Sequence, residues 1–195
     1  FLYFIAPNKN ANHLLEMAPV DQSRKLLKRR ANKKTSHKPD VTIIDLKNHM
    51  VGRAATVIAK QLLLGKRVTV VRTDEANIAG AEIRNKIKYL NFLRKKHQTN
   101  PKKGPFHRRA PSEVFTRVVR NMLPFYTKRG KSAIRRLRAY EGIPANVARA
   151  GTRYTIPKAL RATRLAKERA FTVVGNMCKH VGWKYQPIVQ KLEKA

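Results

Sequence analysis

The sequence contains few acidic residues, one cysteine and no long hydrophobic run. Eleven Asp and Glu residues stand against 44 Lys and Arg residues, so the 195-residue chain has a formal net charge of +33. A compact protein with that charge repels itself unless an anionic partner neutralises it. The nucleic-acid backbone is the densest such partner, and the excess of cations runs through every part of the chain rather than one tail. The composition therefore predicts a nucleic-acid-binding protein.

The scarcity of cysteine and of long apolar runs further limits the class of protein that this chain can be. Cys178 is the only cysteine, which excludes an internal disulfide and a zinc site with several thiolates. No apolar run reaches the roughly 18–20 residues of a membrane span, so we expect no membrane partner. Residues 1–6 are apolar but short, and no basic residue precedes them, which argues against a signal peptide. Met17-Ala18-Pro19 resembles an initiation context, so residues 1–16 are either a genuine extension or residues upstream of the natural start.

Motifs of nucleotide-dependent enzymes are also missing. None of the nine glycines forms a Gly-x-Gly pair, and Gly65-Lys66 and Gly130-Lys131 lack the first glycine of a phosphate-binding loop. Asp74-Glu75 are adjacent acids, which we interpret as a solvated turn with local ion pairs to Arg72 rather than as a catalytic pair.

The sulfur and imidazole groups do not form a site either. Cys178 and His180 would lie about 200° apart on a helix, so the expected role of the cysteine is that of a small buried residue. The six histidines show no metal-ligand spacing. The sequence therefore predicts no cofactor, no metal and no small-molecule substrate, and it carries little of the pattern that acid–base catalysis needs.

Hydrophobic patterning predicts an α/β fold. Residues 41–45 form a short β-branched strand, a helix begins near Val51 and ends at Gly65, and residues 67–72 form a second, almost wholly apolar strand. Such a strand–helix–strand unit gives a parallel pair. The expected buried face of the helix comprises Val51, Ala54, Ala55, Ile58 and Leu62.

Further helices are expected along the rest of the chain. After Gly80 we expect a long helix with Ile83, Ile87, Leu90 and Leu93 facing inward. A proline-punctuated loop should cover 98–111. Ser112 should cap a helix whose buried stripe is Val114, Phe115, Val118, Val119 and Met122. Further helices are expected over 132–138, 158–170 and 187–193.

The strongest local signal for nucleic-acid binding lies in residues 104–138. The stretch 104–111 combines prolines, a phenylalanine and basic residues, and arginine-rich stretches follow it. Guanidinium groups suit phosphate oxygens and can stack on unpaired bases. The near-absence of acids argues against an ordinary solvated surface, which intersperses both signs. We expect one positive surface over an apolar floor, and its spacing adds Arg117, Arg120, Arg135, Arg136 and Arg138 as candidate contacts.

An ordered set of short motifs resembles the universal L13 family of large-subunit ribosomal proteins, in its eukaryotic and archaeal form. The set spans about residues 41–193. Its members are Ile44-Asp45, Val51-Gly52-Arg53-Ala54-Ala55, Leu64-Gly65-Lys66, Asn77-Ile78-Ala79-Gly80, the eight residues from Gly104 to Pro111, Met122-Leu123-Pro124, Thr127-Lys128-Arg129-Gly130, Tyr140-Glu141-Gly142-Ile143-Pro144 and Gly182-Trp183-Lys184-Tyr185.

The resemblance implies a fold and a domain organisation. It implies a three-layer α/β/α rRNA-binding domain with a mostly parallel sheet at 41–149. It also implies a basic, mainly helical C-terminal extension at 150–195 that runs across rRNA and neighbouring proteins. Residues 1–40 match no part of the family pattern, and we interpret them as a basic N-terminal arm.

The resemblance also implies a function and partners. The protein would be a structural, non-catalytic component on the solvent side of the large subunit that joins early in assembly. Its partners would be large-subunit rRNA and neighbouring ribosomal proteins, in cytoplasmic ribosomes with nucleolar assembly if the source is eukaryotic. RNA contact transfers by position to Arg53, His107, Arg108, Arg109, Lys128, Arg129 and Lys131.

Two other classes remain as alternatives. An RNA-modifying or RNA-cleaving enzyme on an α/β scaffold would need a cofactor pocket or clustered carboxylates near the strand ends, and the sequence shows neither. A DNA-architectural protein would need minor-groove wedges or a helix-turn-helix pattern, which are also missing.

Overall fold

The structure is a computed structural model of the chain, and it describes residues 41–149 and 151–194. These residues fall within one compact unit, Pro39–Ala195. The arm expected at 1–40 lies outside the described residues.

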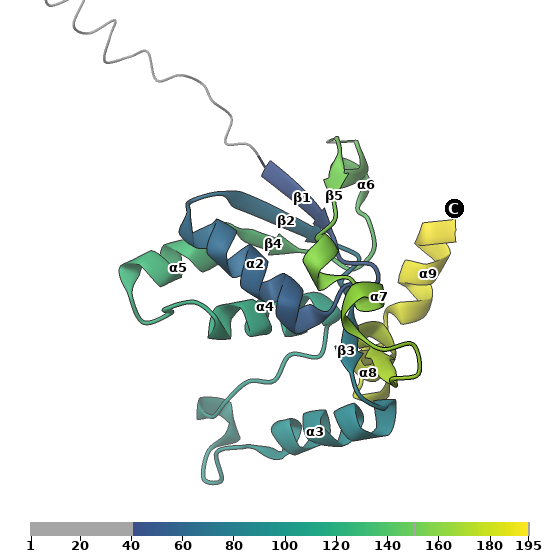
Figure 1. Cartoon of the computed structure of the whole chain (residues 1–195). Coiled ribbons are helices and arrows are strands. Elements are labelled where there is room, and N and C mark those ends of the chain that lie inside the picture. Colours follow the sequence, from purple (N-terminus) through teal and green to yellow (C-terminus); the bar gives the residue numbers. More distant parts are fainter. Residues whose placement is uncertain (1–40, 150, 195) are drawn as a thin grey trace, which may run out of the picture. The chain divides into compact units, whose positions relative to one another are not determined.

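The main sheet of the described residues has four strands, all parallel, in the order β4-β2-β1-β5 (Figure 1). Its strands are β1 (Val41–Asp45), β2 (Arg67–Val71), β4 (Leu137–Ala139) and β5 (Arg153–Tyr154). Helix α2 (Val51–Leu63) connects β1 to β2, as the sequence predicts. The expected α/β class with a parallel sheet flanked by helices is confirmed.

The core forms where α2 meets the sheet. Ile44, Val68 and Val70 belong to one buried cluster with Ala54 and Ile58 of α2, and both of these α2 residues are completely buried. Helix α2 also packs against α4 (Pro111–Asn121) and α5 (Lys128–Arg135). Burying a side chain such as Ile58 contributes about 2 kcal/mol. All five residues predicted for the buried face of α2 are buried.

Gly65 ends α2, as predicted. Its φ of 93° is a left-handed value that favours glycine. There the Lys66 N–H donates to the Gln61 carbonyl and the Gly65 N–H donates to the Leu62 carbonyl. The chain thereby reverses into β2.

A second, two-stranded antiparallel sheet joins distant parts of the chain. It pairs β3 (Asn77–Ala79) with β6 (Phe171–Val173), and α8 (Val174–His180) follows β6 directly. Met177, Cys178 and Trp183 belong to the same core cluster as α2. Residues after 150 thus supply part of the core, which the sequence predicts only for Cys178.

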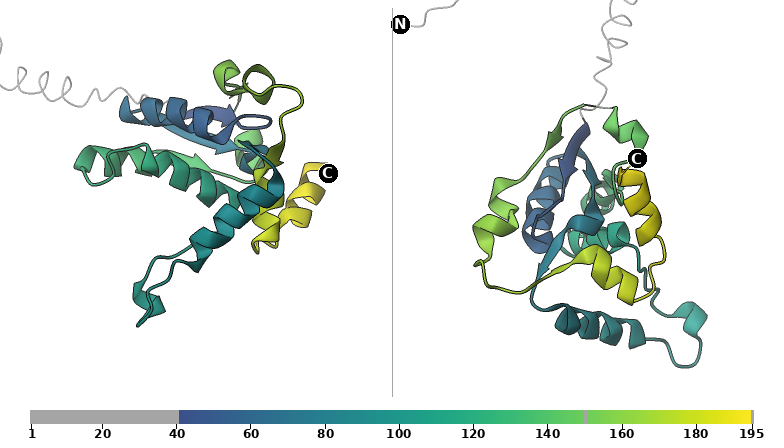
Figure 2. Two further views of the ribbon diagram at one scale, coloured as in Figure 1. Left: turned by 60° about the horizontal axis from the view of Figure 1, so that its bottom comes forward. Right: turned by 90° about the vertical axis from the view of Figure 1, so that its right-hand side faces the viewer.

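The remaining elements are short, apart from α3 and α9. Helix α8 lies beside α3 (Figure 2). The bounds of these elements are η1 Thr73–Glu75, α3 Glu82–Arg94, η2 Pro101–Lys103, α6 Ala145–Ala148, η3 Pro157–Ala159, α7 Arg161–Arg164 and α9 Gln186–Lys194.

The predicted inward face of α3 is wrong for its first two members, while Leu90 and Leu93 are half-buried. Ile83 and Ile87 are 73% and 52% exposed, whereas the polar Asn85 is buried. The side-chain amide of Asn85 donates to the Thr172 hydroxyl at 2.8 Å and to the Ala79 carbonyl at 3.2 Å. These hydrogen bonds satisfy a buried amide and fix the rotation of α3, so the isoleucines face solvent.

Helix boundaries near the predicted positive surface also differ from the sequence expectation. Helix α4 begins at Pro111 rather than after a Ser112 cap, and the Ser112 hydroxyl instead donates to Glu141 at 2.6 Å. Met122, expected in the buried stripe, is exposed. Proline fits the first helical position because it lacks an N–H that would otherwise stay unpaired.

The basic helix expected at 132–138 lies earlier. Helix α5 begins at Lys128, where the Thr127 hydroxyl accepts a hydrogen bond from the Gly130 N–H, and Leu137–Ala139 form strand β4. Within the segment 158–170, predicted as helical, only α7 and the last residues of η3 are helical.

Candidate nucleic-acid interface

Two arginines of α4 lie on aromatic rings. The Arg117 guanidinium carbon is 3.5 Å from the Phe92 ring centroid, and that of Arg120 is 3.7 Å from the Phe125 centroid. Both arginines are exposed and lie three residues apart, so they share one side of the helix. A cation–π contact fixes the guanidinium plane and leaves N–H groups free at its edge. These two arginines are thus oriented before any anion binds.

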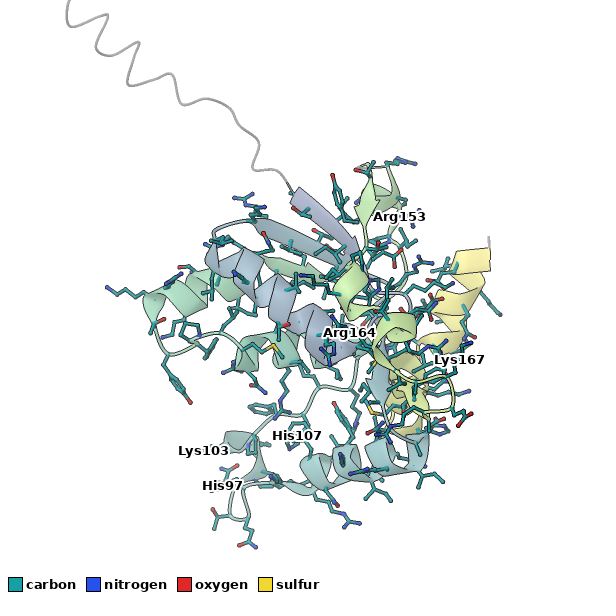
Figure 3. All side chains as sticks on the ribbon, in the orientation of Figure 1. His97, Lys103, His107, Arg153, Arg164 and Lys167 are labelled. Atoms are coloured by element: carbon teal, nitrogen blue, oxygen red, sulfur yellow. The ribbon has the colours of Figure 1, made fainter. Side chains whose placement is uncertain are left out.

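The loop between α3 and α4 is held by its own side chains. The Asn100 N–H donates to His97 Nδ1 at 3.1 Å, and the Asn100 side-chain oxygen accepts from the Lys102 N–H at 3.1 Å. Gly104 lies so close that an added Cβ would be 2.7 Å from the Cβ of His97. Figure 3 shows His97, Lys103 and His107 grouped on this loop. The loop is therefore a folded unit.

His107 fastens this loop to the end of α3. Its Nε2 is 2.7 Å from the Lys95 carbonyl, and its ring lies edge-on to Phe92 with centroids 4.2 Å apart. His107 Nδ1 is buried without a hydrogen-bond partner among the described residues. The sequence predicted only an RNA contact for His107 and did not predict these contacts within the protein. That predicted contact stays a prediction.

A tyrosine on α3 makes a second contact between this helix and the loop. The Tyr89 hydroxyl donates to the Arg108 carbonyl, and burial raises the pKa of Tyr89 to about 12, so the donor proton is retained. The Arg108 side chain pairs with Glu113, the single acid within residues 104–138. The neighbouring Arg109 is exposed.

Helix α5 carries four of the predicted contacts on its exposed surface. These are Lys128, Arg129, Lys131 and Arg135. Arg53 on α2 and Arg138 on β4 are exposed as well. Helix α5 packs against both α2 and β4, and α4 does the same, so these cations lie on elements that contact one another.

Arg136 differs from the other predicted contacts. Its Nη2 donates to the Leu62 carbonyl at 2.8 Å, and the side chain is half-buried. This carbonyl, at the C-terminal end of α2, also accepts from the Gly65 N–H, so Arg136 adds a second hydrogen bond at a helix end where a cation complements the helix dipole. Arg136 therefore has a structural contact within the fold, which the sequence did not reveal.

The acidic residues gather elsewhere, at the carboxyl end of β1 and β2. Arg72 pairs with Asp45 and lies 3.8 Å from Glu75, which Lys47 approaches to 3.3 Å. The interpretation of Asp74 as a solvated residue is wrong, because Asp74 is buried and accepts a hydrogen bond from the Gly142 N–H at 3.0 Å. Burial raises the pKa of Asp74.

In the described part of the chain, the Cys178 thiol is buried and no cluster of ligand side chains could hold a metal ion. Cys178 is buried, as predicted, and burial raises the pKa of its thiol to about 12, which suppresses the nucleophilic thiolate. Across residues 41–149 and 151–194, no three His, Cys, Asp or Glu residues cluster as metal ligands would. In the same ranges, no helix has the length and apolar character needed to span a bilayer.

Comparison with known proteins identifies the family. A family model described as ribosomal protein L13 matches residues 39–146. The chain belongs to this family. The L13 match contains all twelve residues predicted to contact RNA. A relative from Spodoptera frugiperda, named large ribosomal subunit protein uL13, is 49% identical over 151 residues, which are 77% of this chain and 74% of the relative. The family resemblance predicted from the motifs is confirmed.

The L13 motifs did not reveal the aromatic partners of the arginines. Phe92 and Tyr89 lie three residues apart on α3, a spacing that places both on one helix face. Outside the predicted set, Arg161 lies over the Phe171 ring at 3.9 Å in the same manner. The pair of Arg120 and Phe125 could have been suggested because the two residues are close in the sequence. Phe92 could not be assigned to Arg117 in this way, because it lies in a different helix.

Proposed function

We propose that this protein is a structural constituent of the large ribosomal subunit that binds and stabilises rRNA. The single observation that carries the proposal is the set of exposed guanidinium groups on α4, α5 and the preceding loop, of which the two on α4 rest on aromatic rings, in a stretch where Glu113 is the one acid in residues 104–138. Membership of the L13 family and the uL13 relative support the same role. The role is structural rather than catalytic.

The proposed binding mode is phosphate neutralisation combined with shape recognition. Log affinity should fall by about 0.7–0.9 per phosphate contact for each log unit of salt. Side chains cannot read the deep groove of A-form RNA, so shape and unpaired nucleotides supply specificity. Arg53, Arg108, Arg109, Arg117, Arg120, Lys128, Arg129, Lys131, Arg135 and Arg138 are the proposed RNA contacts. His107 and Arg136 contribute chiefly through contacts within the protein.

The proposal includes partners and a location. Neighbouring ribosomal proteins would complete the binding environment, and the protein would act on cytoplasmic ribosomes after assembly in the nucleolus if the source is eukaryotic. The carboxylates at the ends of β1 and β2 do not favour the RNA-modifying alternative, because Arg72 pairs with Asp45 and Asp74 accepts a hydrogen bond from Gly142 within the fold.

Incorporation into ribosomes tests the proposal. We compare the wild type with a triple variant R109E/R129E/R135E and with the matched variant R109K/R129K/R135K, which keeps the charge. These side chains are exposed, so circular dichroism should be unchanged in all three proteins. On a sucrose gradient, the wild type and the lysine variant should co-migrate with the large subunit, and the glutamate variant should stay near the top.

The same gradient can contradict the proposal. Wild-type protein that stays at the top, or that co-migrates after the rRNA has been digested with nuclease, would exclude an rRNA-binding structural role. A glutamate variant that incorporates normally would show that the assigned contacts are wrong.

A further inference from the structure

Phe106 is an exposed phenylalanine on the loop before α4. Its side chain is 78% exposed, although its neighbour His107 is half-buried against Phe92. We propose that Phe106 is a stacking platform for an unpaired nucleobase of the bound RNA. The inference deepens the proposed function and rests on it, because it names the class of nucleotide that this loop recognises.

The loop is ordered on both sides of Phe106. On one side, Gly104 packs on His97, and on the other His107 bonds to the Lys95 carbonyl at 2.7 Å. The backbone of Arg108 is fixed by Tyr89. Figure 2 (left) shows α3 and this loop extending away from the sheet. An apolar ring is thus held in solvent by a framework that loses little entropy on binding.

The chemistry around the ring fits RNA. Lys102 and Lys103 precede Phe106, Arg108 and Arg109 follow it, and all four are exposed. Lysines and arginines can hold the phosphates of a strand while an aromatic face receives its bases, as in single-strand binding sites. A base within a duplex has both faces covered, so the stacked nucleotide must be unpaired, in a loop, bulge or strand end.

A protein pocket is the competing occupant. The cores of protein interfaces are depleted of charged residues, because burying an unpaired charge is costly. Acidic residues are scarce here, and Glu113 is already engaged by Arg108. The charge pattern therefore favours a nucleic acid over an apolar protein groove.

Binding of the full-length protein to a large-subunit rRNA transcript tests the inference. F106L should weaken binding about tenfold, within the roughly 5- to 150-fold range of lost base stacking. The slope of log affinity against log salt should not change, because no phosphate contact is lost. F106W, which keeps an aromatic face, should bind as tightly as the wild type. I83A is the control, since Ile83 on α3 is similarly exposed and apolar but lies outside the proposed RNA contacts, and it should bind normally.

A second variant checks the role of the loop. G104A places a methyl group against His97 and should displace the loop. If the loop presents Phe106, G104A alone should weaken binding, and F106L added to it should have much less effect than F106L alone. Ultraviolet cross-linking in native large subunits should also join a nucleotide to the peptide that contains Phe106.

The outcomes are distinguishable from those of the proposed function. If F106L binds the transcript like the wild type, base stacking is excluded while rRNA binding stands. If F106L keeps full RNA affinity but fails to enter large subunits, Phe106 contacts a protein instead and the inference is overturned. If the wild type itself does not bind the transcript, the proposed function fails.

Discussion

Arg72 donates two hydrogen bonds to the carboxylate of Asp45, so the ends of two adjacent parallel strands are joined by a charged pair. The Nε–Oδ1 distance is 2.9 Å, and Nη2 donates to Oδ2. Arg72 holds a left-handed backbone with φ 52°, which directs the chain from β2 into η1. Burial alone would raise the pKa of Asp45, but the bonds from Arg72 and from the Lys47 N–H outweigh it and lower that pKa.

The first prediction concerns this pair. D45N removes a charge-assisted interaction between the buried Asp45 and the half-buried Arg72 guanidinium, and it should cost about 2 kcal/mol of folding free energy at neutral pH. Because the folded pKa of Asp45 is lowered, its stabilisation is present above the ordinary value of 3.8 and is lost as the pH falls through the folded value. Urea unfolding of both proteins across that range should show the difference at neutral pH and its disappearance in acid. A constant difference at all pH values would contradict the assignment.

The second prediction concerns Asp74, whose pKa is shifted in the opposite direction to that of Asp45. Burial, with repulsion from Glu75 and Glu141, raises the pKa of Asp74 despite the hydrogen bond from Gly142. The stability contributed by the protonated form is present below the unfolded pKa and is lost as the pH rises through the folded one. D74N keeps an oxygen acceptor for Gly142, so it should be more stable than the wild type at neutral pH and similar in acid. Thermal unfolding at the two pH values checks this, and lower stability at neutral pH would refute it.

The third prediction separates two adjacent arginines. R136M removes the bond to the Leu62 carbonyl and should lower stability by about 1 kcal/mol. R135M removes an exposed cation and should leave stability within about 0.5 kcal/mol, while reducing the salt slope of RNA binding by about 1. Urea unfolding and salt-dependent RNA binding measure the two effects. The reverse pattern would show that Arg136, not Arg135, faces the RNA.

The fourth prediction uses two helical glycines. At Gly130, an added Cβ would lie 2.0 Å from the Pro124 carbonyl oxygen, so G130A should force the start of α5 away from that turn and cost about 3 kcal/mol or more. At Gly52, nothing lies within 4 Å of an added Cβ, and the residue is in α2. G52A should therefore stabilise the protein by up to about 1 kcal/mol. Thermal unfolding of both variants provides the comparison, and equal effects would contradict the packing at Gly130.

The sequence predicts the first strand–helix–strand unit closely because its pattern is strong and local. Val51, Ile58 and Leu62 recur with helical spacing, and Gly65 marks the helix end. The positions of β4 and β5 were not predictable in this way. Strands of three and two residues are too short to show alternation, and Arg138 reads as the continuation of a basic helix.

The prediction of which side of α3 is buried failed for a different reason. Periodicity assigns Ile83 and Ile87 to the core, but a single buried amide, Asn85, decides which side of the helix faces the protein. Its partner Thr172 is 87 residues away in the chain. A local sequence pattern does not reveal a contact of this kind. For the same reason it does not reveal that Arg117 lies on the Phe92 ring.

For the candidate interface too, some features were predictable from the sequence and others were not. Exposed cations were predictable from charge, because almost every arginine in a chain so poor in acids must face outward. The hydrogen bonds that Arg136 and His107 make within the protein were not predictable. Both bonds go to carbonyl groups at the ends of helices that lie elsewhere in the sequence.

The pairing of β3 with β6 has a consequence for synthesis. Asn77 pairs with Val173, and Trp183 fills the core next to residues made more than a hundred positions earlier. A nascent polypeptide that has emerged only as far as α6 therefore lacks the pieces that close its interior. Until the later segments leave the exit tunnel, apolar side chains made earlier, such as Ala76 and Phe115, lack the cover that Val174 and Met177 supply, and the partly made chain depends on other molecules for protection.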